Sequence, residues 1–122
     1  MLKNSGHNKQ IGKLGEEFVT EYLKKCGFKI LERNWHCSKI AEVDIIALDG
    51  DVLVFVEVKT RSNLQCGHPF EAVNHTKLKK IQQAIPIYIA EKNIKTSSFR
   101  IDLVAVIGTK DFKIEHLRGI GF

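Results

Sequence analysis

The sequence predicts a mixed α/β fold in which one sheet of about five strands is flanked by helices, in the order α-β-β-β-α-β-β. Two segments, one near the N-terminus and one in the second half of the chain, carry apolar residues at the three- and four-residue spacing of an amphipathic helix. The other segments are rich in β-branched and aromatic residues and are bounded by turn-forming residues. Because strand and helix patterns alternate along the chain, a sheet covered by helices would bury the apolar faces of both.

Two helices are expected, at residues 10–26 and 74–91. The apolar stripe of the first consists of Ile11, Leu14, Phe18 and Tyr22. That of the second consists of Leu78, Ile81, Ile85 and Tyr88. Gly27 follows the first helix as its C-terminal cap. Pro86 lies inside the second and removes a backbone hydrogen bond, so we expect a kink or a break there.

Five strands are expected, at residues 28–35, 42–48, 52–59, 99–107 and 111–116, with a loop at 60–70. Asp49-Gly50 indicates a two-residue hairpin turn, in which Leu48 would face Asp51 and Glu42 would face Glu57. The apolar residues expected on one face are Val43, Ile45, Val54, Val56 and Val58, and those on the other are Ile46, Leu53 and Phe55. A hairpin that is apolar on both faces belongs in the centre of a sheet.

Length, composition and charge limit the class of protein. With 122 residues, the chain is expected to form one domain over residues 1–122. No apolar run approaches the roughly 18 residues of a membrane span, and residues 1–13 lack the apolar core of a secretory signal. Three cysteines without C-x-x-C spacing favour reduced thiols, and the cytoplasm is the expected compartment. The net charge of +5 favours nucleic acid as a partner only weakly, because a solvated basic surface explains it better.

One face of the predicted hairpin gathers charged residues. Alternation of side chains places on it Glu42, Asp44, Phe55, Glu57 and Lys59. Sheltered carboxylates resist ionising together, so either Lys59 or a divalent cation such as Mg²⁺ must compensate them. With a metal, the group suits phosphodiester hydrolysis, in which the ion polarises the phosphoryl oxygen and activates water. The alternative is a structural ion-pair cluster of Glu57, Lys59 and Arg61, which spacing alone favours.

The hairpin signature resembles that of a nuclease superfamily. Asp44 followed by Glu57-Val58-Lys59 on the next strand is similar to the D…(D/E)-x-K pattern of restriction-endonuclease-like nucleases. Over nearly the whole chain, the sequence resembles the YraN family of uncharacterised bacterial proteins (uncharacterised protein family 0102), which is similar in fold to archaeal Holliday-junction resolvases. The blocks that carry this resemblance are Gly12-x-x-Gly15-Glu16, Tyr22-Leu23, Ile30-Leu31-x-Arg33-Asn34, Glu42-Val43-Asp44-Ile45-Ile46-Ala47, Val54-Phe55-Val56-Glu57-Val58-Lys59-x-Arg61, Gly67-x-Pro69, Glu71-Ala72-Val73, Arg100-x-Asp102-x-Val104 and Glu115-His116. Ala41 departs from the family, which usually has glycine there.

The resemblance implies a restriction-endonuclease-like fold and roles for individual residues. The metal ligands for Mg²⁺ or Mn²⁺ would be Asp44, Glu57, the Val58 carbonyl and Glu16, with Glu42 added by its place on the same face. Lys59 would assist the attacking water, so that the catalytic residues are Asp44, Glu57 and Lys59. The alternative for Glu16 is a solvated glutamate beside Glu17, which helical periodicity alone favours.

Residues that could contact a phosphate follow the motif strand or begin the second helix. They are Arg61, Gln65, His68, Lys77 and Lys80. Arg61 is the strongest of them because it lies on the same face as Lys59 and its guanidinium suits phosphate. Residues of this kind in loops and charge runs are most often only solvated.

The leading hypothesis is a metal-dependent endonuclease that cuts branched or structured DNA in repair or recombination. The resemblance also implies a homodimer, whose two-fold symmetry would suit a four-way junction. The alternative is a non-catalytic nucleic-acid-binding adaptor that works with a helicase or another repair protein. Clustered acids repel phosphate unless a cation intervenes, which argues for the enzyme. A third interpretation makes the acids structural in a protein-interaction domain.

Overall fold

The computed structural model describes residues 2–65, 67–96 and 98–121, with side chains from Gly12 onward except that of Ala72. Its elements are α1 (Leu2–Lys25), β1 (Lys29–Cys37), β2 (Ala41–Asp49), β3 (Val52–Arg61), the 3-10 helix η1 (Pro69–Ala72), α2 (His75–Glu91), β4 (Phe99–Ile107) and β5 (Lys113–Leu117). The strands form one sheet in the order β1-β2-β3-β4-β5, in which β3 and β4 are parallel and the other neighbours antiparallel. The predicted fold class and element order are confirmed. Among the helices of these residues, none is both long and apolar enough to cross a membrane.

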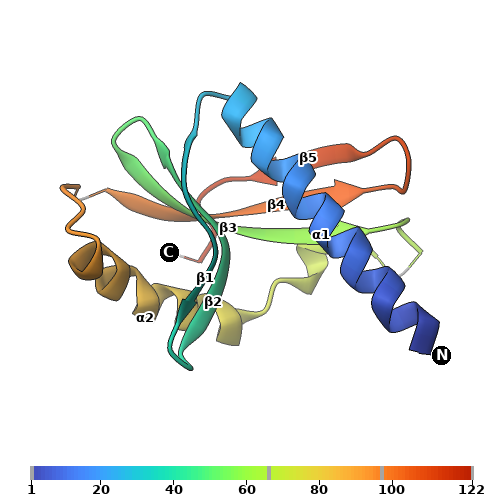
Figure 1. Ribbon diagram of the computed structural model, residues 1–122, viewed down its shortest axis with the longest axis horizontal. Helices are drawn as coiled ribbons and strands as arrows, with labels where there is room; N and C mark the ends of the chain where they lie inside the picture. The colour runs from blue at the N-terminus through green and yellow to red at the C-terminus, as the bar shows by residue number, and fades with distance from the viewer. Residues whose placement is uncertain (1, 66, 97, 122) are drawn as a thin grey trace.

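The two long helices lie on opposite faces of the sheet, and each covers its own apolar cluster (Figure 1). On the α1 face, Val19 and Leu23 pack with side chains of β2, β3 and β4, among them Ile45, Val54 and Val104. On the α2 face, the cluster contains Leu78, Ile81, Ile85 and Tyr88 together with Ile46, Leu53, Phe55 and Ile101. Because β3 contributes buried residues to both clusters, it is the central strand, as predicted.

Helix α1 begins earlier and packs through a different stripe than expected. The backbone is helical from Leu2, because polar residues can continue a helix without the apolar spacing that marked its start at Gln10. Among residues 12–25, those that it buries are Gly15, Val19, Thr20 and Leu23. Leu14 and Phe18 remain 58% and 40% exposed, so the predicted stripe is wrong there, and the side chain of Ile11 lies outside the described residues. The predicted cap at Gly27 is confirmed: its φ of 90° lets Phe28 N donate to Leu23 O at 2.9 Å.

Helix α2 follows its predicted stripe, whose four apolar side chains are all buried. Asn74 caps its start by accepting hydrogen bonds from Thr76 N at 2.9 Å and Lys77 N at 3.2 Å. The break expected at Pro86 is wrong, because the helix continues as one element through it. The exposed position of Pro86 leaves the carbonyl that lost its partner on the solvent side of the helix.

The predicted hairpin register is also wrong, by two residues. Leu48 pairs with Leu53 and Asp49 with Val52, so the turn residues are Gly50 and Asp51 rather than Asp49 and Gly50. Gly50 has a φ of 60°, a value that favours glycine at the first turn position. A shift of two residues preserves which side chains share a face. The last β2–β3 pair is Ile45 with Val56. In this register Asp44, rather than Glu42, is therefore the β2 residue at the level of Glu57.

The first part of β2, residues 41–44, does not pair with β3 and forms with β1 a two-stranded arm, which curls toward α2 (Figure 1). Trp35 of the arm packs edge-on against Tyr88 of α2, with ring centroids 5.0 Å apart. Val43 therefore packs in the α2-side cluster, not with Val54 and Val56 as predicted, because strict alternation is lost where the arm turns. Opposite this point, Asn34 of β1 has a φ of 52°.

Two shorter corrections concern residues 60–70. Thr60 and Arg61, expected in a loop, extend β3 because they pair with Val106 and Ile107 of β4. Pro69, also expected in the loop, begins the 3-10 helix η1.

Cys26 and Cys37 are free thiols, whereas Cys66 lies outside the described residues.

Candidate functional site

Asp44 stands where β2 leaves β3. Its Oδ2 accepts a hydrogen bond from Val58 N at 2.8 Å, so the side chain bonds the β3 backbone beyond the last β2–β3 pair. Burial raises the pKa of Asp44, and the charge of Glu57 raises it further, to about 7, against the lowering effect of the Val58 amide. Asp44 is therefore a sheltered carboxylate whose ionisation its surroundings oppose.

Glu57 is buried between two lysines. Its Oε1 accepts a hydrogen bond from Lys77 Nζ of α2 at 2.6 Å and lies 3.6 Å from Lys59 Nζ of β3. Its Oε2 is buried and has no hydrogen-bond partner among the described residues. A cavity of about 20 Å³, lined in part by these three side chains, adjoins the carboxylate and has room for about one water molecule. One oxygen of Glu57 is thus paired and the other is left without a partner.

Glu16 is brought to these acids by the close approach of α1 to β3. A Cβ on Gly15 would lie 2.1 Å from Thr60 Cγ2, so this distance requires a glycine in the helix. Burial raises the pKa of Glu16, the charges of Glu42 and Glu57 add to the rise, and Arg33 opposes it. We call Glu16, Glu42, Asp44 and Glu57 the acid cluster. The glutamate that the resemblance implied is therefore near enough for the charges of Glu42 and Glu57 to act on it.

A groove of about 460 Å³ lies between the β1–β2 arm and the start of α2. We call it the arm groove; its lining includes His36, Lys39, Glu42, Thr76, Lys77 and Lys80. Glu42 is exposed there, with its Oε1 3.9 Å from His36 Nε2. The groove is basic apart from Glu42, and Lys77 belongs both to it and to the surroundings of Glu57.

The residues predicted to contact phosphate are spread over several places. Arg61 donates from Nη1 to Thr60 O at 2.9 Å, and Gln65 is exposed. His68 pairs through Nε2 with Glu115, while its Nδ1 accepts from Phe70 N at 3.1 Å, so both ring nitrogens are engaged. Lys77 and Lys80, in contrast, line the arm groove beside the acid cluster.

The acid cluster has the donor chemistry of a Mg²⁺ or Mn²⁺ site but not yet its geometry. Carboxylate oxygens suit these hard ions, and the unpartnered Oε2 of Glu57 fits such a ligand. Yet within residues 2–65, 67–96 and 98–121 no three His, Cys, Asp or Glu residues are placed so as to hold an ion together. The ammonium group of Lys77 lies on Glu57 instead.

Comparison with known proteins places the chain. Residues 15–106 match the model of a family described as "Uncharacterised protein family UPF0102". The chain belongs to this family. A UPF0102 protein of Dictyoglomus thermophilum is 49% identical over 108 residues, which cover 88% of this chain and 91% of the relative. UPF0102 proteins of Arthrobacter sp. and Clostridium kluyveri are each 44% identical, covering 91% and 82% of this chain and 95% and 81% of theirs. The predicted membership of uncharacterised protein family 0102 is confirmed.

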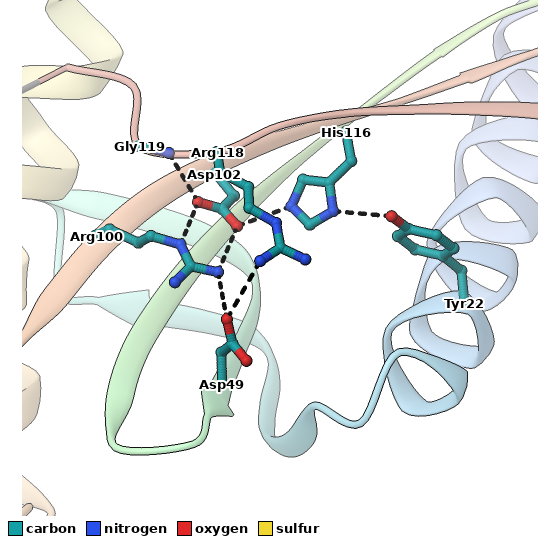
Figure 2. Close-up of polar contacts among 7 residues, drawn as sticks. All are labelled: Tyr22, Asp49, Arg100, Asp102, His116, Arg118 and Gly119. Carbon is teal, nitrogen blue, oxygen red and sulfur yellow. Dashed lines mark hydrogen bonds and ion pairs between the residues drawn. The ribbon is translucent and has the colours of Figure 1, made fainter.

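A second polar network lies on the α1 face of the sheet (Figure 2). Its centre is Asp102 of β4, which is fully buried. Asp102 accepts hydrogen bonds from Arg100 Nε at 2.9 Å and Gly119 N at 3.0 Å, and its Oδ2 lies 2.8 Å from His116 Nε2. Nδ1 of His116 lies 3.0 Å from the hydroxyl of Tyr22. Burial alone would raise the pKa of Asp102, but the hydrogen bonds from His116, Arg100 and Gly119 lower it.

This network joins elements that are far apart in the sequence of this UPF0102 member. Arg100 Nη2 also donates to Asp49 Oδ2 at 2.9 Å, and Arg118 Nη1 lies 3.5 Å from the same oxygen. The network thus ties α1, β4, β5 and the end of β2 together (Figure 2). Since the carboxylate of Asp102 is satisfied on both oxygens, the network stabilises the fold rather than offering a ligand site.

Sequence reasoning missed the part that Lys77 plays at Glu57 and gave Asp102 and His116 no role. For Asp102 a signal existed: an acid in the middle of a strand that is apolar apart from Arg100 must be paired. For Lys77 no local signal existed, because its partner precedes it by 20 residues and lies on another element.

Proposed function

We propose that this member of the family is a Mg²⁺- or Mn²⁺-dependent endonuclease that cuts branched or structured DNA in repair or recombination in the cytoplasm. The observation that carries the proposal is the sheltered pair of Asp44 and Glu57. Asp44 has its pKa raised to about 7, and Glu57 has one buried oxygen without a partner among the described residues. A divalent cation beside both carboxylates would offset the burial and the charge of Glu57 that raise the pKa of Asp44.

Each residue of the proposed metal site has a distinct role. Asp44 and Glu57 would hold the metal, with the Val58 carbonyl, Glu16 and Glu42 as further ligands. The bound ion would polarise a phosphoryl oxygen and lower the pKa of its water. The Val58 amide keeps Asp44 oriented, since it fixes one carboxylate oxygen at 2.8 Å.

Lys59 supports the chemistry from beside Glu57. Its Nζ lies 3.6 Å from Glu57 Oε1, and its side chain is 29% exposed, so the ammonium can reach a water molecule or a phosphate oxygen while staying next to the carboxylate. A positive charge in this position stabilises the negative charge that develops on a phosphate during hydrolysis. The lysine is also the third member of the predicted motif.

The proposal includes a homodimer. Leu14 and Phe18 of α1, which are 58% and 40% exposed, form part of an apolar surface that a second copy could cover. Phe112 extends this surface, with its ring centroid 5.1 Å from that of Phe18. Sedimentation velocity should give a dimer for the wild type and a monomer for Leu14→Glu; a wild-type monomer at all concentrations would rule the dimer out.

The test of the metal site is calorimetric titration with Mn²⁺. We expect Asp44→Asn and Glu57→Gln to lose binding, whereas Asp111→Asn, the same substitution at an exposed turn between β4 and β5, should keep it. Cleavage is then assayed on four-way, flap and linear DNA with each protein. Binding and cleavage that disappear together in the site variants would support the enzyme, and absence of Mn²⁺ binding in the wild type would refute it.

One observation favours the adaptor as a second candidate. Lys77 holds Glu57, and no three acids of the described residues are arranged around one point. A protein that binds nucleic acid for a helicase or repair protein needs no metal. DNA binding by the wild type that is unaffected by EDTA, without cleavage of any of the three substrates, would identify this second function.

A further inference from the structure

Lys77 is the residue of α2 that reaches the acid cluster. Its Nζ lies 2.6 Å from Glu57 Oε1, and its side chain is 40% exposed, whereas that of Glu57 is 7% exposed. The lysine therefore contacts a buried carboxylate with its ammonium group while its side chain remains partly exposed to solvent. The sequence analysis expected Lys77 to bind phosphate and did not foresee that its ammonium group pairs with Glu57.

We propose that Lys77 is a displaceable internal cation: it occupies Glu57 until a divalent ion binds, and then moves to a phosphate of a nucleic-acid strand in the arm groove. This inference rests on the proposed metal site. It explains why the acids have the right chemistry for an ion and yet are not arranged around one point in the described part of the chain. Lys77 draws the carboxylate of Glu57 toward α2.

The first step of the argument is competition for one oxygen. An ammonium group 2.6 Å from Glu57 Oε1 occupies the side from which a metal would approach that oxygen. Two cations on the same carboxylate also repel each other, strongly where water is largely excluded. A divalent ion can therefore bind Glu57 fully only after Lys77 has left it. Lys59, at 3.6 Å, leaves more room and need not move.

The second step is that the arm groove can accept the ammonium group of Lys77 once it has left Glu57. It lines the arm groove, in which Lys39, Lys80 and His36 provide further positive or protonatable groups. The lysine stem has four flexible carbons, so the ammonium can swing from Glu57 into the groove without a change in α2. The basic lining suits the phosphates of an extended nucleic-acid strand, whose backbone would then run beside the acid cluster.

The third step is reciprocity. If metal binding frees Lys77 for a phosphate, the metal raises the affinity for the strand, and the strand must raise the affinity for the metal by the same factor. The free protein would then bind a divalent ion weakly, and substrate would load it. Metal and nucleic acid would be coupled through one side chain.

The experiment compares the wild type with Lys77→Met, which keeps the stem and removes the charge. Lys110→Met, the same substitution at an exposed position between β4 and β5, is the matched control. Calorimetry with Mn²⁺ should give about tenfold tighter binding for Lys77→Met than for the wild type, within the usual range of coupling between sites. The control should bind Mn²⁺ as the wild type does.

The coupling is measured with a fluorescent single-stranded oligonucleotide at fixed salt, with and without Mn²⁺. The affinity of the wild type should rise on addition of Mn²⁺, and this rise should largely disappear in Lys77→Met. Lys77→Gln provides the same comparison if the methionine variant is poorly folded. Equal Mn²⁺ affinities of the wild type and both variants would overturn the inference alone, whereas absence of Mn²⁺ binding in all of them would overturn the metal site as well.

Discussion

Asp44→Asn should stabilise the folded protein, and increasingly so as the pH rises. The pKa of Asp44 is raised from 3.8 to about 7, chiefly by burial and then by the charge of Glu57. Folding therefore opposes ionisation, and stability is lost as the pH rises from about 4 to about 7. Each pKa unit corresponds to 1.36 kcal/mol, so the full loss above the folded pKa is about 4 kcal/mol. Asparagine cannot ionise, and its side-chain oxygen can still accept the hydrogen bond from Val58 N.

The difference between two pH values isolates this effect from other consequences of the substitution. Between pH 5 and pH 8, the advantage of Asp44→Asn over the wild type should grow by about 2–3 kcal/mol, measured by urea unfolding in the presence of EDTA. Asp111→Asn, at an exposed position, is the control. An Asp44→Asn advantage that is the same at both pH values would show that the carboxylate is not held under electrostatic strain, and the argument for a cation at this place would fail.

Three further substitutions test the packing around the site by urea unfolding. Gly15→Ala should lose about 1–3 kcal/mol because its Cβ would meet Thr60 Cγ2, and Thr60→Ser should recover part of that loss; additive effects would contradict the contact. Asp102→Ala should lose about 3–5 kcal/mol at pH 7 because it leaves a buried network without its anion, and a loss under 1 kcal/mol would mean that the network is dispensable. Trp35→Ala should lose about 3–5 kcal/mol and speed amide exchange in the arm, because the contact with Tyr88 holds the arm to α2; unchanged exchange would show that the arm is held elsewhere.

The sequence was most informative where one physical cause dominates. The stripe of α2 is made of large apolar side chains, which have to be buried, so periodicity located the helix and its packed face. The stripe of α1 was misjudged because Gly15, where the helix approaches Thr60 of β3, leaves no apolar signal, so the buried side was not recognised although Val19 and Leu23 lie on it. Close packing of backbones and burial of large side chains are different ways to dock a helix, and hydrophobic periodicity detects only the second.

The acids of the site were identified from alternation along two strands, but their relations to other elements were not. A two-residue hairpin turn permits glycine in either of its positions. The turn could therefore be formed by residues 49 and 50 or by residues 50 and 51, and the two choices give strand registers that differ by two residues. Val43 packs on the α2 face because the pairing of β2 with β3 ends nearby, and the place where that pairing ends is set by tertiary structure. The pairing of Lys77 with Glu57 likewise depends on how α2 crosses the sheet, which no local pattern encodes.

The parallel pairing of β3 with β4 has a consequence for the order of folding. Strands β1, β2 and β3 are joined by short turns and can pair early, whereas β3 and β4 pair only after the segment that contains η1 and α2 has closed between them. Asp44 and Glu57 both lie on the early strands, and Lys77 arrives with the late helix. The two carboxylates are therefore brought together with Lys59 but before Lys77, and their repulsion raises the folding barrier. The chain should fold faster below the pKa of Asp44 than above it, while Lys77 acts mainly by slowing unfolding.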